Sequence, residues 1–219
     1  MKTKAENYSA ELIERRWLSN KSFEIALTKP KSFEYTPGQW IRLIHDAVER
    51  DYSLVSAATD PNLALCIRNI EGGILSPGLS NAPVGSCFNF NGPHGYFTFR
   101  PSTRPAVFAA TGTGLAPFVS MARSGVTGFI LLHGVRSAKD LYYTSVIKSA
   151  AKQYVPCLSG TDSLSGEYFR GRVTDYLRKN LAPGRYDFYL CGRREMIRDV
   201  TFLVDEKFPG SLIFTETFY

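Results

Sequence analysis

The sequence predicts two domains of different class: an N-terminal antiparallel β-barrel over residues 1–100 and a C-terminal α/β domain over residues 101–219. Short segments of alternating apolar and polar residues, separated by turn sequences, fill the first part. In the second part, short continuous apolar runs alternate with helical stretches about five times, which is typical of a doubly wound, five-stranded parallel sheet. The proline-containing stretch "FRPSTRP" marks the linker between them.

The composition is that of an ordinary globular protein, with 44% hydrophobic and 21% charged residues in 219. No apolar run approaches the length of a membrane span, and charges continue through the first residues. We therefore expect no signal peptide, no membrane segment and a cytoplasmic location. The net charge is +6, but there is no Lys/Arg run longer than two residues and no recognition motif, which argues against nucleic acid and suits an acidic partner.

The cysteines and histidines do not indicate a metal site. The four cysteines are far apart, and the three histidines show no ligand spacing. We expect reduced and mostly buried thiols, no metal ion and no iron–sulfur centre.

The barrel is predicted from its strands and turns. "SFEIALTK" (22–29) alternates apolar Phe23, Ile25 and Leu27 with polar neighbours. "GQWIRLIH" follows the turn "TPG", and "LALCIRNI" follows the turn "TDPN". Further turn signals occur at "EGG" and "NGPHG". Several short strands at this spacing predict a barrel or a sandwich.

The α/β domain is predicted from five buried strands, at "PAVFAA" (105–110), "GFILLHG" (128–134), "YVPCLS" (154–159), "RYDFYLCG" (185–192) and "SLIFTETF" (211–218). Helices are expected after "TGTGLAP" and over residues 138–153, 171–180 and 193–207. Ligands of such a sheet bind beyond the carboxyl ends of its strands, so the motifs at those ends are the candidates for function.

Two stretches of the barrel carry candidate phosphate and ring contacts. In "RDYSLVSA" (50–57), Arg50 offers a planar cation for a phosphate, Tyr52 a ring for stacking and Ser53 a hydroxyl. Taken alone, these residues are better interpreted as an edge strand with an exposed arginine. In "EGGILSPGLSN" (71–81), a glycine turn leads to Ser76, where a helix would begin with free N–H groups for a pyrophosphate. A plain turn and N-cap explain that stretch equally well.

Three stretches of the α/β domain carry further candidates. "ATGTGLAPF" (110–118) lies between a strand and a helix, as a dinucleotide loop does, but lacks the full G-x-G-x-x-G spacing. Cys191 in "YLCGRREM" is either a small core residue or a neighbour of a nicotinamide, and a nucleophilic role is disfavoured because no base is evident. The aromatic end "FTETFY" either packs on the protein's own surface or covers a flavin.

The order of these motifs along one chain resembles the ferredoxin–NADP(H) reductase superfamily. The series is R-x-Y-S, G-x-L-S, G-P-x-G-x-F, G-T-G-x-A-P and C-G-x-x-x-M, and it covers nearly the whole chain. "RDYS", "GGILSPGL" and "ETFY" are most similar to the bacterial ferredoxin (flavodoxin) reductases.

The resemblance implies an FAD-binding barrel, with FMN the less favoured flavin, followed by an NAD(P)-binding domain. It implies a flavin-dependent oxidoreductase that moves electrons between NAD(P)H and a one-electron carrier such as ferredoxin or flavodoxin. Two alternatives remain: the reductase component of an oxygenase system, or a non-catalytic nucleotide-binding subunit.

The resemblance also implies roles for individual residues. Arg50 would contact the flavin pyrophosphate, and the catalytic group would be Tyr52 on the ring, Ser53 at its N5 edge, and Cys191 with Glu216 near the nicotinamide. Further flavin contacts would be Leu54, Cys66, Ile67, Arg68, Gly73, Ile74, Leu75, Ser76, Phe218 and Tyr219. The nucleotide would contact Thr111, Gly112, Thr113, Gly114, Pro117, Arg136, Cys191 and Gly192. The resemblance also implies two arginines for the 2′-phosphate of NADP, one after the second strand of the nucleotide domain and one after the third. Arg136 fits the first position. The second position, in "CLSGTD", has no arginine, and Arg170 or Arg172 would replace it, so the choice between NADP and NAD stays open.

Overall fold

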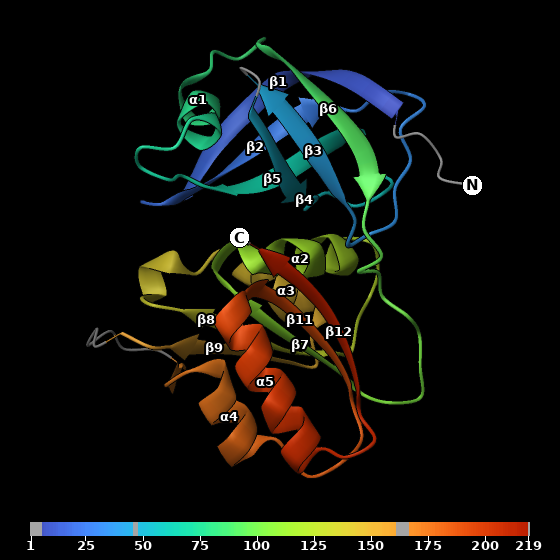
Figure 1. The fold of residues 1–219 in the computed structure, drawn as a ribbon, viewed down its shortest axis with the longest axis vertical. Helices are drawn as coiled ribbons and strands as arrows, with labels where there is room; N and C mark the ends of the chain where they lie inside the picture. Colours follow the sequence, from blue (N-terminus) through green and yellow to red (C-terminus); the bar gives the residue numbers. More distant parts are fainter. Residues whose placement is uncertain (1–5, 46–47, 161–166, 219) are drawn as a thin grey trace. The chain divides into compact units, whose positions relative to one another are not determined.

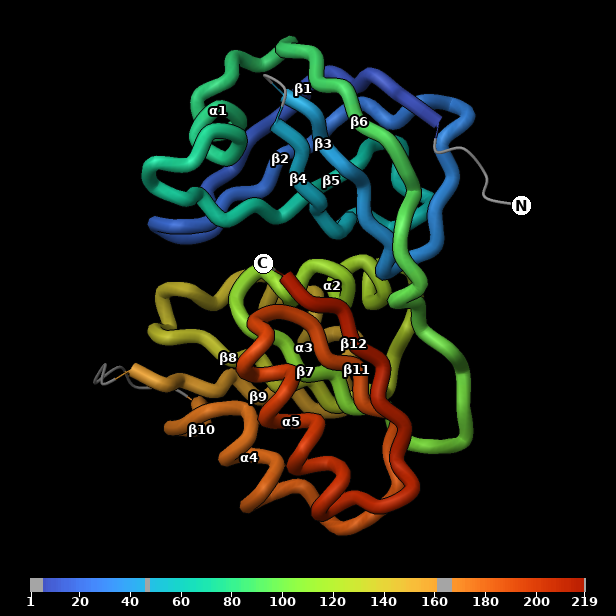
Figure 2. The backbone as a smooth tube through the Cα atoms, in the orientation of Figure 1, coloured from blue at the N-terminus to red at the C-terminus, as the bar shows by residue number. Residues whose placement is uncertain are grey.

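The computed structural model describes residues 6–45, 48–160 and 167–218, and the chain divides into two compact units. Unit 1 comprises Met1–Thr98 and Ala116–Ser124, and unit 2 comprises Phe99–Leu115 and Gly125–Tyr219. Figures 1 and 2 show the curled antiparallel sheet of unit 1 and the parallel sheet of unit 2. The predicted fold class is confirmed. Residues 116–124, expected in the second domain, group by their contacts with the barrel.

Unit 1 is built on six antiparallel strands in the order β4-β3-β6-β1-β2-β5. They span β1 Glu6–Ser19, β2 Ser22–Thr28, β3 Trp40–His45, β4 Val48–Ser53, β5 Asn62–Arg68 and β6 Cys87–His94. Just beyond β4, Leu54 forms a bridge with Leu65 of β5, and the Val55 N–H donates to the Ala64 carbonyl at 2.8 Å. These contacts join the two outer strands, so the sheet curls into a barrel.

The barrel core contains the apolar residues whose alternation predicted β2, together with apolar residues of β3, β5 and β6. Its fully buried side chains include Phe23, Ile25, Leu27, Ile41, Leu63, Leu65, Ile67 and Phe90. The 14-residue strand β1 was not predicted, because charged residues interrupt its pattern and only Ala10 and Leu12 are buried. Pairing with β2 on one side and β6 on the other determines that strand.

The turn predicted at "NGPHG" is wrong. Asn91–His94 form the end of β6, where Asn91 pairs with β1 and β3 and His94 pairs with Trp40. The register of β3 against β6 shifts between Trp40 and Arg42 at this place. Glycine and proline occur both in turns and at irregularities of strand pairing. Here they mark such an irregularity, so their presence alone did not distinguish the two.

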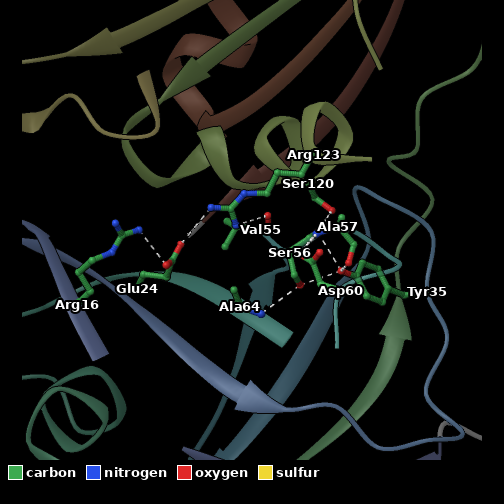
Figure 3. A network of polar contacts seen from close by, with 10 residues as sticks. All are labelled: Arg16, Glu24, Tyr35, Val55, Ser56, Ala57, Asp60, Ala64, Ser120 and Arg123. Carbon is green, nitrogen blue, oxygen red and sulfur yellow. Dashed lines mark hydrogen bonds and ion pairs between the residues drawn. The ribbon is translucent and has the colours of Figure 1, made fainter. Parts of the chain in front are cut away.

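Unit 1 also contains helices α1 (Leu75–Asn81) and α2 (Ala116–Arg123). Figure 3 shows the polar network that ties α2 to the segment following β4. Ser120 Oγ donates to the Ser56 carbonyl at 2.7 Å, and Arg123 Nη1 donates to the Val55 carbonyl at 2.9 Å. The Tyr35 hydroxyl lies 2.8 Å from Ser56 Oγ, and burial raises the pKa of Tyr35 to about 12. Val55 and Ser56, near the end of "RDYSLVSA", are therefore held by hydrogen bonds from α2, and Ser56 is also held by Tyr35.

Unit 2 is a six-stranded parallel sheet in the order β10-β9-β8-β7-β11-β12. Its strands are β7 Ala106–Thr111, β8 Ile130–Val135, β9 Gln153–Leu158, β10 Phe169–Arg170, β11 Asp187–Arg193 and β12 Leu212–Phe218. All five predicted strands are present. The sixth, β10, has two residues and is too short to give a periodic signal.

The helices of unit 2 are α3 Thr144–Ala150, α4 Val173–Asn180 and α5 Arg194–Lys207, with 3₁₀ helices η1 Gly112–Leu115 and η2 Ala138–Asp140. α4 and α5 pack on one face of the sheet over Val107, Leu132 and Leu190. The other face carries an aromatic cluster of Phe108, Phe129, Tyr189 and Phe214. None of the helices in the described part of the chain is long and apolar enough to cross a membrane.

The helix predicted over residues 138–153 is shorter than expected. It is divided into η2 and α3, and β9 already begins at Gln153. Tyr143, at the N-cap of α3, has a φ of 56° in the left-handed region, which a continuous right-handed helix does not allow. The local sequence is helical in character, and the tertiary structure interrupts it.

Candidate functional site

The predicted flavin residues of β4 lie on the outer strand of the barrel sheet. Tyr52 is half-buried against the core, and Arg50, two residues earlier on the same face, is exposed. Burial raises the pKa of Tyr52 to about 12, while the nearby Arg50 charge acts in the opposite direction. Ser53 is buried and lies on the other face, paired with Trp40. A cation and a neutral aromatic ring thus share one face of β4.

The loop between β5 and α1 leads to hydrogen-bond donors at the start of α1. These donors lie near β4, because α1 contacts that strand. Ser76, predicted at the start of the helix, is its second residue; Ser76 Oγ accepts a hydrogen bond from the Ile70 N–H at 3.0 Å. The preceding Gly72 has a φ of 75°, which favours glycine. The N–H groups of Leu75 and Ser76 have no partner within the helix.

A buried acceptor in the same loop also needs a partner. Asn69 Oδ1 is buried and accepts no hydrogen bond from any described residue. At the far end of α1, Arg15 Nη1 donates to the Ala82 carbonyl at 2.7 Å and fixes the helix. A ligand bearing a diphosphate and free hydroxyl groups would supply acceptors for the N–H groups and a donor for Asn69. The residues present therefore fit a flavin nucleotide.

The other predicted flavin residues lie around the same loop. Leu54, Ile67 and Leu75 are core residues, so their backbones rather than their side chains are available to a ligand. Cys66 and Arg68 lie on the opposite face of β5 from Ile67. Ile74 is exposed at the N-cap of α1, and Gly73 N donates to the Ile70 carbonyl at 2.9 Å.

The predicted nucleotide residues of unit 2 meet at the switch point of its sheet. β8 to β10 lie on one side of β7, and β11 and β12 lie on the other, so η1 after β7 meets the end of β11. Ligands of open parallel sheets bind at this position. A Cβ on Gly114 would clash with the Cys191 carbonyl oxygen and lie 2.6 Å from Gly192 Cα. Only glycine allows this backbone contact.

The contact is reinforced from the β11 side. Gly192 has a φ of 128°, and a Cβ there would clash with Thr111 Oγ1. The same hydroxyl accepts a hydrogen bond from the Arg193 N–H at 2.9 Å. Gly112 has a φ of 55° with open space where its Cβ would be. The segment Thr111–Gly114 is therefore held against β11 at Thr111 and Gly114, with open space at the Cβ position of Gly112.

Cys191 and Glu216 are neighbours in the sheet, since Cys191 of β11 pairs with Glu216 of β12. Cys191 is fully buried, and burial together with the Glu216 charge raises the pKa of its thiol well above the usual range. The thiol is therefore neutral, as expected of a small core residue and not of a nucleophile. Phe218, the last residue of β12, pairs with Arg193, while Tyr219 lies outside the described residues. Pro117 is the second residue of α2.

Exposed arginines follow the carboxyl ends of other strands in unit 2. Arg136 follows β8, Arg170 ends β10 and Arg172 follows it. Arg193 ends β11. Each guanidinium is suited to a phosphate group. This edge of the sheet is basic at the side where a dinucleotide would be expected.

Comparison with known proteins identifies the family. Residues 9–99 match the oxidoreductase FAD-binding domain family, and residues 108–201 match the oxidoreductase NAD-binding domain family. The chain is 32% identical over 218 residues to the ferredoxin–NADP reductase B of Sorangium cellulosum, covering 88% of this chain and 89% of that one. The chain belongs to the ferredoxin–NADP(H) reductase superfamily.

Membership in this superfamily confirms the resemblance inferred from the motifs, and with it FAD and a nicotinamide nucleotide as cofactors. The chain is also 31% identical to the toluate 1,2-dioxygenase electron transfer component of Pseudomonas putida, covering 91% of this chain but 64% of that relative's length. The fold matches an Amycolatopsis cytochrome P450 reductase with a TM-score of 0.84 at 26% identity, covering 99% of this chain and 72% of that one. A ferredoxin NADP⁺ reductase from Neisseria gonorrhoeae has the same fold, with a TM-score of 0.85 at 21% identity and 99% and 100% coverage.

Sequence reasoning did not single out two buried polar residues beside the candidate sites. One is Asn69, whose buried acceptor lies in the loop between β5 and α1. His133 is buried beneath Gly112, and its single position in an apolar strand gave no sign of a role. Neither residue belongs to a spaced motif, so only the tertiary structure reveals them.

Proposed function

We propose that this protein is an FAD-dependent reductase that takes electrons from NAD(P)H and delivers them singly to a ferredoxin-type carrier protein. The observation that carries the proposal is the backbone contact of Gly114 with Cys191 and Gly192 at the switch point of an NAD-binding domain. It holds the loop close against the end of β11, at the position where ligands of open parallel sheets bind. The chain also contains the matched FAD-binding domain.

The protein's own residues support binding and orientation. FAD, when bound, supplies the chemistry that links a two-electron donor to a one-electron acceptor. Arg50 presents its cation for the diphosphate, and Tyr52 presents a neutral, half-buried ring for stacking. The neutral thiol of Cys191 occupies little space and adds no charge beside the nicotinamide position. These roles for Arg50, Tyr52 and Cys191 are part of the proposal.

The electron acceptor is proposed from charge and from relatives. The net charge of +6 favours an acidic carrier. The names of two relatives, from Sorangium cellulosum and from a naphthalene dioxygenase system, specify ferredoxin. A flavodoxin has similar acidic character and is the second acceptor to test.

A role as reductase component of an oxygenase system is a specific alternative. It is favoured by the similarity to the toluate dioxygenase electron transfer component, a longer protein. The four cysteines show no iron–sulfur spacing, so in either case the one-electron centre that accepts from the flavin would lie outside residues 1–219. Co-purification or kinetic coupling with an oxygenase would favour this alternative over a general ferredoxin reductase.

The first experiment is an absorbance spectrum of the purified protein, followed by anaerobic titration with NADPH and NADH. We expect flavin bands that bleach on addition of nucleotide, and stopped-flow reduction of an acidic ferredoxin once nucleotide is supplied. A protein that remains colourless after incubation with FAD and FMN would contradict the proposal.

Two variants assign the binding roles. Arg50→Ala should lower flavin retention about tenfold, while Arg50→Lys, which keeps the charge but loses the planar fork, should be intermediate. Arg136→Ala should weaken NADPH binding more than NADH binding if Arg136 contacts a 2′-phosphate. Equal effects on the two nucleotides would exclude that contact.

A further inference from the structure

A buried histidine lies directly beneath the nucleotide loop. His133 on β8 is fully buried. Its Nε2 lies 3.4 Å from the Gly112 carbonyl oxygen, at the long end of hydrogen bonding, and its Nδ1 lies 3.2 Å from the Tyr154 hydroxyl. The Tyr142 ring packs edge-on at 5.8 Å. The histidine therefore joins β8, β9 and the first residue of η1.

The partners of His133 determine which nitrogen carries its hydrogen. Burial lowers the pKa of His133 to about 4, so the ring is neutral near pH 7. The Gly112 carbonyl can only accept, so Nε2 carries the hydrogen and donates. Nδ1 must then accept from Tyr154, whose hydroxyl stays protonated because burial raises its pKa. Each hydrogen-bonding group in this chain of contacts has one consistent role.

This arrangement orients the peptide between Gly112 and Thr113. In a planar trans peptide the C=O and N–H groups point in opposite directions. The Gly112 carbonyl points toward His133, so the Thr113 N–H points away from the buried ring. A Cβ added at Gly112 would meet no atom of the described residues within 4 Å, apart from Gly112 itself and its two chain neighbours. The His133 contact thus sets the orientation of a peptide that begins at Gly112, a residue with open space at its Cβ position.

We propose that His133, held by Tyr154, is a positioning residue for the nicotinamide nucleotide: it fixes the Gly112–Thr113 peptide in the orientation that binds the nucleotide. The proposal rests on the proposed function of this loop. The opposite end of η1 is fixed by the Gly114 contact with β11, so His133 provides the second anchor of the loop.

The test measures binding of oxidised NADP⁺ and NAD⁺ to the flavin-loaded protein by calorimetry, without turnover. His133→Phe keeps a ring but removes the donor, and it should weaken nucleotide binding about fivefold, as expected for one lost hydrogen bond. His133→Gln can donate to Gly112 and accept from Tyr154, so it should restore binding to within about twofold. Tyr154→Phe leaves Nδ1 without its donor and should give a smaller loss.

A matched control separates positioning from general destabilisation. Phe129 is buried and stacks on Phe108 in the aromatic cluster, with ring centroids 4.5 Å apart. Phe129→Leu should lower the thermal stability and leave nucleotide affinity unchanged. Nitrogen-15 NMR of labelled histidine should show the tautomer with hydrogen on Nε2, and that signal should change in Tyr154→Phe.

The outcomes distinguish the two proposals. If wild type binds nucleotide and His133→Phe binds within twofold of it, the positioning role is overturned and the proposed function stands. The same holds if Phe129→Leu weakens binding as much as His133→Phe does. If wild-type protein that retains flavin binds neither nucleotide, the proposed function itself fails.

Discussion

The buried His133 makes the stability of unit 2 depend on pH in a range that can be calculated. Its folded-state pKa is about 4, against an ordinary value of 6.5, because burial disfavours the charged ring. Between these values the unfolded chain binds more protons than the folded one, so the stabilisation is complete above pH 6.5 and is lost as the pH falls toward 4. The linkage relation gives a loss of about 2 kcal/mol between pH 7.5 and pH 5.0.

The assay compares urea unfolding of wild type and His133→Phe at these two pH values. Other groups that titrate alike in both proteins cancel in this comparison. The difference in unfolding free energy between wild type and variant should therefore be about 2 kcal/mol smaller at pH 5.0 than at pH 7.5. Both tryptophans, Trp17 and Trp40, lie in unit 1. Tryptophan fluorescence therefore reports the unfolding of unit 1 alone, whereas circular dichroism reports the unfolding of both units. A stability difference that is the same at both pH values to within about 0.5 kcal/mol would refute the argument.

Two further predictions follow from the switch point and the thiols. Gly114→Ala should force η1 away from β11, because the added methyl group would clash with the Cys191 carbonyl. Nucleotide affinity, measured by calorimetry, should fall at least tenfold, while flavin content, measured by the ratio of flavin to protein absorbance, stays unchanged. An unchanged affinity would contradict the tight contact. Brief alkylation of the native protein should label Cys87, the exposed thiol, and spare the buried Cys191, which reacts only after unfolding. Peptide mass spectrometry would show this, and rapid native labelling of Cys191 would be inconsistent with its burial and raised pKa.

The sequence alone was sufficient for the fold class and the family. Period-two alternation placed β2, continuous apolar runs placed five parallel strands, and the order of short motifs identified the family and its cofactors. These properties are local, since glycine turns, apolar periodicity and strand-to-loop transitions lie within a few residues of one another. Each motif was weak alone, and their fixed order along the chain made the inference specific.

The tertiary structure decided what depends on distant partners. The charged strand β1 is defined by pairing with β2 and β6, and α2 groups with the barrel through contacts from Ser120 and Arg123 to the segment after β4. The neutral state and the proposed role of His133 rest on burial and on Tyr154 and Gly112, neither of which is close to it in sequence. Burial and long-range hydrogen bonding arise only when distant segments pack together, so no local pattern encodes them.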